Sequence, residues 1–219
     1  MMPGLPLLLA GSLVTIEISV LAGLLALVAA LVAALAAGLA RQSARRALRW
    51  PAAAYIELFR GTALLIQLFW MYYVLPDFGV DLPAFAVAVL AVGLNYGAYG
   101  AEVVRGATEA IGRGQREAAL ALGLSPRLTM RLVVLPQAAA VAVLPWGNLM
   151  VQLVKATSLV SLITIADLSY RAYQLNQVTL RTAGIFGAVL VLYFVITQAV
   201  AAATRWADRG IGRWRRVTA

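Results

Sequence analysis

The feature that most limits the fold is a long apolar run near the N-terminus. Leu5 to Leu39 is almost wholly apolar, and Glu17 is its only charged residue. A helix needs about 20 apolar residues to cross the hydrocarbon core of a bilayer. In lipid the backbone must satisfy its own hydrogen bonds, which a helix does within one segment. We therefore predict an all-α polytopic membrane protein, a single transmembrane domain over 1–219, with five spans at about 8–39, 52–75, 84–106, 132–154 and 183–204.

The overall composition favours the same class. Hydrophobic residues make up 63 % of the chain and charged residues 12 %, whereas soluble domains carry about 25 % charged residues. A net charge of +9 would suit a nucleic-acid-binding protein, but the arginines cluster between apolar spans, so we expect no nucleic acid partner. The segment 159–182 is too polar for a span, and we interpret it as a re-entrant or surface-lying piece on the outer side.

The arginine clusters predict the orientation. Cytoplasmic loops of membrane proteins carry an excess of Lys and Arg. One set of segments, alternating along the chain, holds Arg41, Arg45, Arg46, Arg49, Arg105, Arg113, Arg116, Arg127, Arg131, Arg205, Arg209, Arg213, Arg215 and Arg216. The opposite set holds only Arg171 and Arg181. We therefore expect the N-terminus outside, the loop 107–131 and the C-terminus in the cytoplasm, and the basic tail with Trp206 and Trp214 anchored on membrane lipid.

Several kinds of chemistry are excluded by what the sequence lacks. The chain has no cysteine and no histidine, which removes disulfides, Cys/His metal sites and catalysis by either residue. No GxxxxGK[ST] phosphate-binding loop occurs, so the chain has no such site for a nucleotide of its own. We expect no catalytic residue, no metal and no cofactor bound by this chain, and we expect any ATP to be hydrolysed by a separate subunit.

The loop between the third and fourth spans has a strong local pattern, GQREAALALGLSPRLTMRLVVLP from Gly114 to Pro136. Good helix formers fill 115–122, and Gly123 suits the position after a helix C-terminus. Ser125 and Pro126 form an N-cap and first-turn pair that starts a second helix. The loop is therefore predicted to be helix, tight bend and helix before the chain re-enters the membrane.

This loop resembles the EAA motif in the membrane subunits of ABC importers. The resemblance rests on Glu117-Ala118-Ala119, Gly123, Val133 and Leu135-Pro136. The flanking Ala98-Tyr99, Glu102, Arg105-Gly106 and Gly114-Gln115 resemble the polar amino acid branch, the histidine and glutamine permease type.

The resemblance implies a type I importer fold in a bacterial inner membrane. It implies that the loop forms a coupling helix that docks on an ATPase subunit carrying ATP-Mg. The residues it assigns to this contact are Gln115, Glu117, Ala118, Ala119, Gly123 and Pro136. It also implies a second permease subunit, identical or different, and an external solute-binding protein.

Polar residues at membrane depth are candidates for a solute path, because lipid disfavours them. They are Gln67, Asn95, Gln152, Lys155, Thr157 and Ser158. Lys155, the only lysine, is a candidate partner for a substrate carboxylate, and the alternative is an interfacial lysine reaching the headgroups. Lys155 to Leu159 resembles the family's Lys-Asp-Thr-Ser-Leu stretch, with Ala156 in place of the aspartate.

Three functions follow from these observations. The first is the membrane subunit of an ATP-driven importer that moves a polar amino acid by alternating access. The second has the same architecture but carries another small polar solute, such as an opine, a polyamine or a sulfur compound. The third, a passive channel or membrane enzyme, is less favoured, because a channel needs no Glu-Ala-Ala loop and no catalytic motif is present.

Overall fold

The computed structural model describes residues 4–42 and 46–211. Arg45 and the tail residues Arg213, Trp214, Arg215 and Arg216, which the charge analysis uses, lie outside the described residues. Within the described ranges the chain is helical and contains no strand. The predicted all-α architecture is confirmed.

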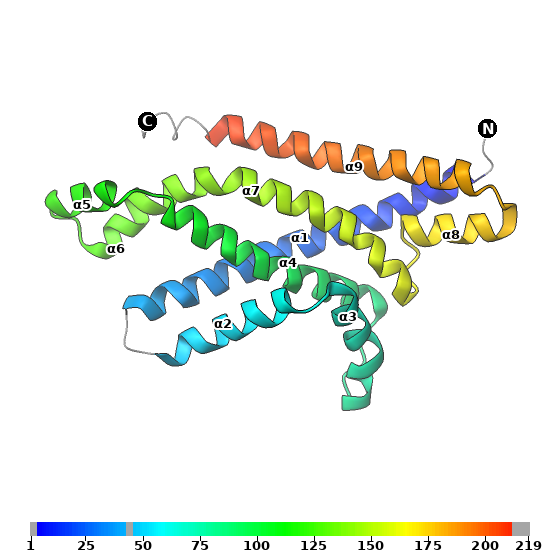
Figure 1. Cartoon of the computed structure of the whole chain (residues 1–219), viewed down its shortest axis with the longest axis horizontal. Coiled ribbons are helices and arrows are strands. Elements are labelled where there is room, and N and C mark those ends of the chain that lie inside the picture. Colours follow the sequence, from blue (N-terminus) through cyan, green and yellow to red (C-terminus); the bar gives the residue numbers. More distant parts are fainter. Residues whose placement is uncertain (1–3, 43–45, 212–219) are drawn as a thin grey trace.

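The elements follow one another along the chain with short connections (Figure 1). The α-helices are α1 (Leu5–Gln42), α2 (Arg46–Gly61), α3 (Leu64–Phe69), α4 (Ala84–Glu109), α5 (Arg113–Ala121), α6 (Pro126–Thr129), α7 (Leu135–Ala156), α8 (Leu168–Thr179) and α9 (Thr182–Ile211). Wider π-helical turns form η1 (Trp70–Val74) and η3 (Met130–Val134), and tighter 3₁₀ turns form η2 (Leu75–Phe78) and η4 (Thr157–Ile163).

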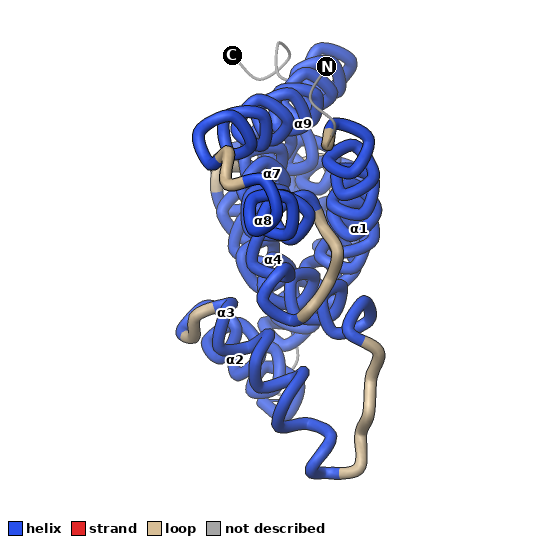
Figure 2. Tube along the Cα trace, turned by 90° about the vertical axis from the view of Figure 1, so that its right-hand side faces the viewer, coloured by secondary structure: helices blue, strands red, loops and turns tan. Residues whose placement is uncertain are grey.

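Four helical segments in the described part of the chain are long and apolar enough to cross a bilayer, at 5–36, 84–109, 126–163 and 182–211. A fifth is reached when 50–61 and 64–78 are counted together, and these two pieces are bent by 106°. The single span expected over 52–75 is therefore broken. Viewed along the long helices, α2 and α3 lie to one side of the bundle of α1, α4, α7 and α9 (Figure 2).

The core lies where α1 and α4 pack. Its fully buried members include Ile18 and Ala22 of α1, Val87 and Val92 of α4, and Leu68 of α3. Gly97 of α4 allows the close approach, because a Cβ there would lie 2.7 Å from Cβ of Ala29 and from the Tyr55 hydroxyl. Small residues at a helix contact let two backbones approach in the membrane.

The two prolines of the fourth span occupy different places in the helix. Pro136 lies in the first turn of α7, just after the π-helical turn η3, and the first turn of a helix tolerates proline because its N–H groups lack helical partners. Pro145 lies inside α7, which continues through it to Ala156. The predicted span 132–154 is part of a longer helical segment over 126–163.

The polar segment after α7 folds against the bundle. Asp167 caps α8 by accepting a hydrogen bond from the Tyr170 amide at 2.9 Å. Leu168 and Ala172 of α8 are buried with Leu8 of α1 and Ile185 of α9. α8 therefore packs against α1 and α9, and it is not among the candidate spans.

Candidate functional site: a polar cavity and a separate coupling loop

The break between α2 and α3 leaves backbone carbonyls without helical partners. The amide of Gln67 repairs this, because its Nε2 donates to the Phe59 carbonyl at 3.0 Å and to the Thr62 hydroxyl at 2.7 Å. It also lies 3.3 Å from the Thr62 carbonyl. Non-helical backbone at membrane depth is tolerated where it is buried in protein or lines a cavity.

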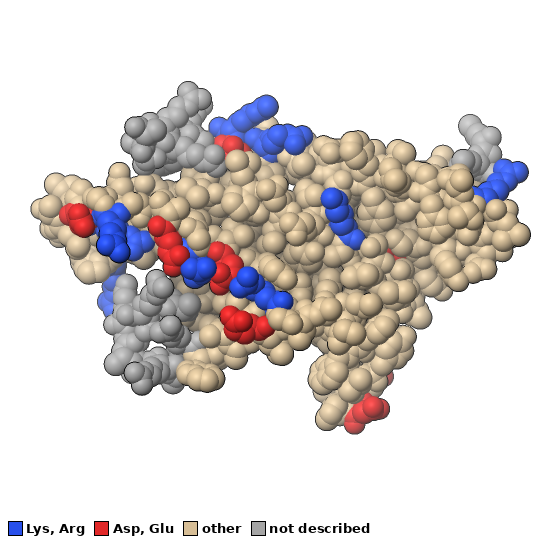
Figure 3. All heavy atoms as spheres, viewed as in Figure 1, with Lys and Arg blue, Asp and Glu red and all other residues tan. Residues whose placement is uncertain are grey.

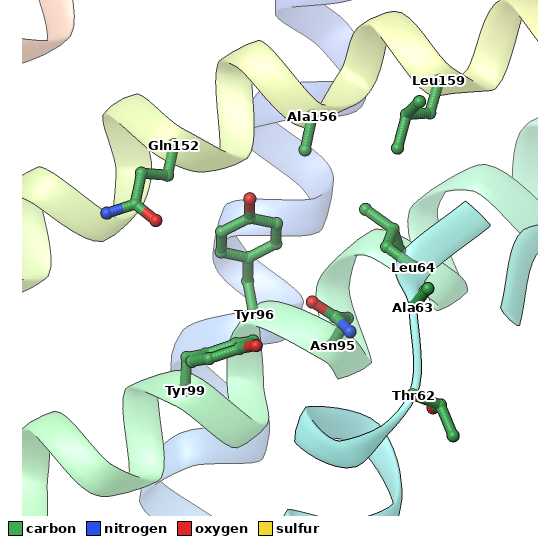
Figure 4. Close-up of a pocket in the computed structure, with 9 residues that line it drawn as sticks. All are labelled: Thr62, Ala63, Leu64, Asn95, Tyr96, Tyr99, Gln152, Ala156 and Leu159. Carbon is green, nitrogen blue, oxygen red and sulfur yellow. The ribbon is translucent and has the colours of Figure 1, made fainter. Parts of the chain in front are cut away.

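A cavity of about 330 Å³ lies beside this break (Figure 4). Its lining residues come from the α2–α3 junction, α4, α7 and η4, and they are Thr62, Ala63, Leu64, Asn95, Tyr96, Tyr99, Gln152, Ala156 and Leu159. Its volume is at the small end of the range of about 300–1,000 Å³ that small-molecule sites occupy. The site therefore suits a small solute.

Asn95 connects the cavity wall to the helix break. Its Nδ2 donates to the Phe59 carbonyl at 2.8 Å and to Oε1 of Gln67 at 3.1 Å. The side chain is almost fully buried, with 4 % of its surface exposed. In Figure 4 its nitrogen turns toward the α2–α3 junction and its oxygen toward the cavity.

Two tyrosines complete the wall formed by α4. The Tyr96 hydroxyl points toward α7, between Gln152 and Ala156 (Figure 4). Tyr99 lies beside Tyr96, three residues further along α4. Outside the lining, the guanidinium carbon of Arg60 lies 5.5 Å from the Tyr99 ring centroid, a cation–π distance. Nη1 of Arg60 also lies 3.8 Å from Oε1 of Glu102, which is an ion-pair distance.

The structure brings together some of the predicted path residues and not others. Asn95 and Gln152 line the cavity, and Gln67 supports Asn95 from behind. Lys155 is exposed on α7 but does not line the cavity. Thr157 is fully buried with its hydroxyl bonded to the Val154 carbonyl, and the Ser158 hydroxyl is bonded to the Lys155 carbonyl. Roles for these three residues in the solute path stay predictions.

The sequence reasoning missed Tyr96 and Tyr99 as cavity residues. Both are ordinary components of an apolar helix, and their hydroxyls carry no charge that marks them. Their spacing from Asn95 could have identified them, because Asn95, Tyr96 and Tyr99 lie within about one turn of α4. A polar residue expected at membrane depth predicts that its helical neighbours share its surroundings.

The α5–α6 loop, which the sequence predicts to couple to an ATPase, forms the tip at one end of the molecule, whereas the α2–α3 break lies near the middle (Figure 1). α5 ends as predicted, because Gly123 has a φ of 78° and its amide donates to the Leu120 carbonyl at 2.9 Å. The Ser125 hydroxyl accepts from the Leu128 amide at 3.4 Å, which caps α6. The predicted helix, bend and second helix are confirmed.

The predicted docking residues are not all on the surface. Gln115, Glu117 and Ala118 are exposed, whereas Ala119 is buried against the rest of the loop. Gly123 is exposed at the turn, and Pro136 is half-buried at the start of α7. α5 therefore exposes Gln115, Glu117 and Ala118 to solvent, whereas the side of the helix that carries Ala119 packs inside the protein.

One helix joins the two sites. α4 lines the cavity through Asn95, Tyr96 and Tyr99 and ends next to α5. Nη2 of Arg116 in α5 donates to the Thr108 carbonyl near the end of α4 at 2.9 Å. Along the same helix, Arg105 pairs with Glu102 at 2.7 Å and with Glu109 at 2.8 Å. Figure 3 shows acidic and basic side chains following one another toward the α5 end of the molecule, while other charged groups are scattered over the rest of this face.

Residues 26–213 match the family model described as "Binding-protein-dependent transport system inner membrane component". A probable amino-acid ABC transporter permease protein, y4tF of Sinorhizobium fredii, is 43 % identical over 167 residues, which is 74 % of this chain and 70 % of the relative. The glutamine transport system permease protein GlnP of Escherichia coli is 37 % identical over 211 residues, 94 % of each chain.

Solved structures agree on the fold. The crystal structure of an amino acid ABC transporter with histidines matches with a TM-score of 0.86 and 33 % identity, covering 93 % of this chain and 94 % of that one. The inward-facing MetNI methionine ABC transporter matches with a TM-score of 0.80 at 22 % identity, over 96 % of this chain and 99 % of that one, which supports the fold alone. The matched residues include both α4 with its cavity wall and the α5–α6 loop. This chain belongs to the family of binding-protein-dependent transport system inner membrane components.

Proposed function

We propose that the chain is the transmembrane subunit of an ATP-driven importer for a polar amino acid, working by alternating access. The relatives that are amino-acid permeases support the solute class. The sequence lacks a phosphate-binding loop of the GxxxxGK[ST] type, so a separate ATPase subunit supplies the energy and carries the ATP-Mg. A solute-binding protein delivers the amino acid from outside.

The observation that carries this proposal is the continuity of α4 between the cavity and the coupling loop. From Tyr99 to Glu109 the helix covers about 15 Å at 1.5 Å per residue, and Arg116 bonds its end to α5. A force applied to α5 by an ATPase therefore moves the same rigid helix that forms the cavity wall. Coupling then requires that nucleotide and solute each prefer one of two conformations.

A polar face on α7 supports a second permease subunit. Asn148, Gln152 and Lys155 are exposed at spacings of four and three residues, so they lie on one side of the helix. They belong to a segment that is long and apolar enough to span the membrane. Lipid disfavours such side chains, so this face meets a second permease chain, identical or different, around a shared solute path.

The orientation follows from the same assignment. The α5–α6 tip lies on the cytoplasmic side of the bacterial inner membrane, where the ATPase is found. The arginine excess of this segment agrees, since Arg113, Arg116, Arg127 and Arg131 stand against Glu117 alone. The N-terminus is then outside and the C-terminus inside.

The test is reconstitution with the cognate ATPase subunit, identified by co-purification from the native membrane. Glu117→Lys reverses an exposed charge on α5 and is expected to weaken ATPase association at least fivefold in co-purification and to reduce ATP-driven uptake. Asp81→Lys makes the same change at an exposed position before α4, away from α5, and is expected to leave association unchanged. Uptake that proceeds without ATP would instead indicate a passive channel and would contradict the proposal.

A further inference from the structure

The cavity wall is polar but carries no formal charge. Its polar side chains in the described part of the chain are Thr62, Asn95, Tyr96, Tyr99 and Gln152, which are hydroxyls and amides. A charge that leaves water for this wall needs a counter-charge or hydrogen bonds, because removing an ion from water without them is costly. The wall therefore favours a solute whose charges compensate each other.

The hydrogen bonds around Asn95 fix which of its atoms a solute meets. Its two N–H groups are taken by the Phe59 carbonyl and Oε1 of Gln67, both of which are acceptors. Rotating the amide by half a turn would bring oxygen against oxygen, so the observed assignment is the stable one. Oδ1 of Asn95 is thus left facing the cavity as an acceptor for an ammonium or amide N–H (Figure 4).

The cavity wall formed by α7 offers both a hydrogen-bond donor and an acceptor. Gln152 is exposed, and its amide has no hydrogen-bond partner among residues 4–42 and 46–211. A primary amide donates and accepts at once, which makes it complementary to another primary amide. The Tyr96 hydroxyl, which points toward Gln152, adds a group that can donate or accept.

The cations nearest to the cavity are placed to serve other contacts. Arg60 lies over the Tyr99 ring and forms an ion pair with Glu102, so part of its charge is already balanced. Lys155 is exposed on α7 and does not line the cavity. Ala156 does line it, at a point where a longer acidic side chain would place a carboxylate inside.

From these contacts we infer that the cavity selects amino acids with an uncharged, hydrogen-bonding side chain, an amide above all, over those with a cationic or anionic side chain. The inference rests on the proposed amino acid permease function and narrows its substrate class. A zwitterion carries no net charge, and its ammonium meets Oδ1 of Asn95 while its carboxylate accepts from tyrosine hydroxyls. A further charge on the side chain finds no counter-charge on the wall.

The test measures binding to the cavity itself. The permease is assembled with its ATPase in lipid nanodiscs without the solute-binding protein, and titration calorimetry is run with L-glutamine, L-glutamate and L-arginine. These three share the same ammonium and carboxylate groups and differ in the side chain. We expect glutamine to bind at least tenfold more tightly than either charged amino acid.

Two variants at one position separate charge from shape. Ala156→Asp adds a carboxylate to the wall and is expected to raise arginine affinity at least tenfold. Ala156→Asn adds nearly the same volume without charge and is expected to leave arginine binding weak. Gain of arginine binding by both variants would show that shape rather than charge governs selection, and would overturn the inference.

The wild-type titrations also separate this inference from the function on which it rests. Equal affinity for glutamine, glutamate and arginine would overturn the selectivity while leaving the amino acid permease function intact. Failure of all three to bind, together with absence of ATP-driven amino acid uptake in the full complex, would instead remove the proposed function and this inference with it.

Discussion

Asn95 and Gln67 are joined by a hydrogen bond of 3.1 Å between Nδ2 and Oε1, across 28 residues of sequence. Both amides also bond to the Phe59 carbonyl, at 2.8 and 3.0 Å, where α2 ends. One contact therefore stabilises a broken helix and orients a cavity residue. The polar groups that permit the break are the same groups that form the site.

Replacing Asn95 with alanine tests this double role. Oε1 of Gln67 would lose this donor, whereas the Phe59 carbonyl would keep the bond from Nε2 of Gln67. One unsatisfied buried acceptor costs about 1–3 kcal/mol. We expect a lower melting temperature and at least a tenfold loss of uptake. The control is Gln177→Ala on the exposed side of α8, which is expected to change neither. A stable Asn95→Ala protein with normal uptake would contradict the assignment.

The α1–α4 contact can be tested with two glycines of one helix. An alanine at Gly97 would place its Cβ 2.7 Å from Ala29, and such overpacking costs about 1–3 kcal/mol. Gly106 of α4 has nothing within 4 Å of the point where an alanine Cβ would lie, so alanine there removes only backbone freedom. We expect Gly97→Ala to melt at a lower temperature and Gly106→Ala to melt at an equal or higher one. The same shift in both would indicate that the helices are not closely packed at Gly97.

Gly123 allows a test of the coupling turn without a steric clash. Its φ of 78° disfavours any residue with a Cβ by about 1–2 kcal/mol, yet nothing lies within 4 Å of that position. Gly123→Ala is therefore expected to increase hydrogen exchange in α5 and to weaken ATPase binding several-fold. Gly114→Ala, also free of neighbours but inside α5, should strengthen the helix and retain binding. Equal ATPase affinity for the two variants would argue against a role for the turn.

Asp167 predicts a pH dependence of stability at the start of α8. It lies before α8, outside the candidate spans, and burial raises its pKa to about 6, against the opposing effect of its hydrogen bonds. Because the pKa is raised on folding, the native state favours the protonated form. Stability is then fully present below about pH 4 and decreases as pH rises through about 6. The loss is at most about 3 kcal/mol, at 1.36 kcal/mol per pKa unit.

The measurement is thermal unfolding between pH 4 and 7.5. Asp167→Asn keeps a side-chain oxygen for the Tyr170 amide and cannot ionise, so its melting temperature is expected to lack the decrease between about pH 4 and pH 6. An unchanged pH profile in this variant would assign the dependence to other groups.

Much of the architecture was accessible from local patterns. The apolar stretches predicted four of the spans, because the cost of exposing backbone in lipid leaves few alternatives to a helix. The loop from Gly114 to Pro136 was also predicted well, since Gly123 and Ser125 act on their immediate neighbours. The site was predicted in part: Asn95 and Gln152 line the cavity, whereas Tyr96 and Tyr99 were overlooked.

The sequence by itself determined which segments are apolar helices and where the loop between α5 and α6 turns, because hydropathy, caps and positive φ act over a few residues. Tertiary structure alone decided that the second span breaks at Thr62 and Ala63, since the donors that satisfy the freed carbonyls include Asn95 from a distant helix. It also decided that Thr157 is buried while Gln152 faces the cavity, although both are polar residues on neighbouring turns. A local pattern gives the period of a helix, but only its packing partners determine which face each side chain occupies.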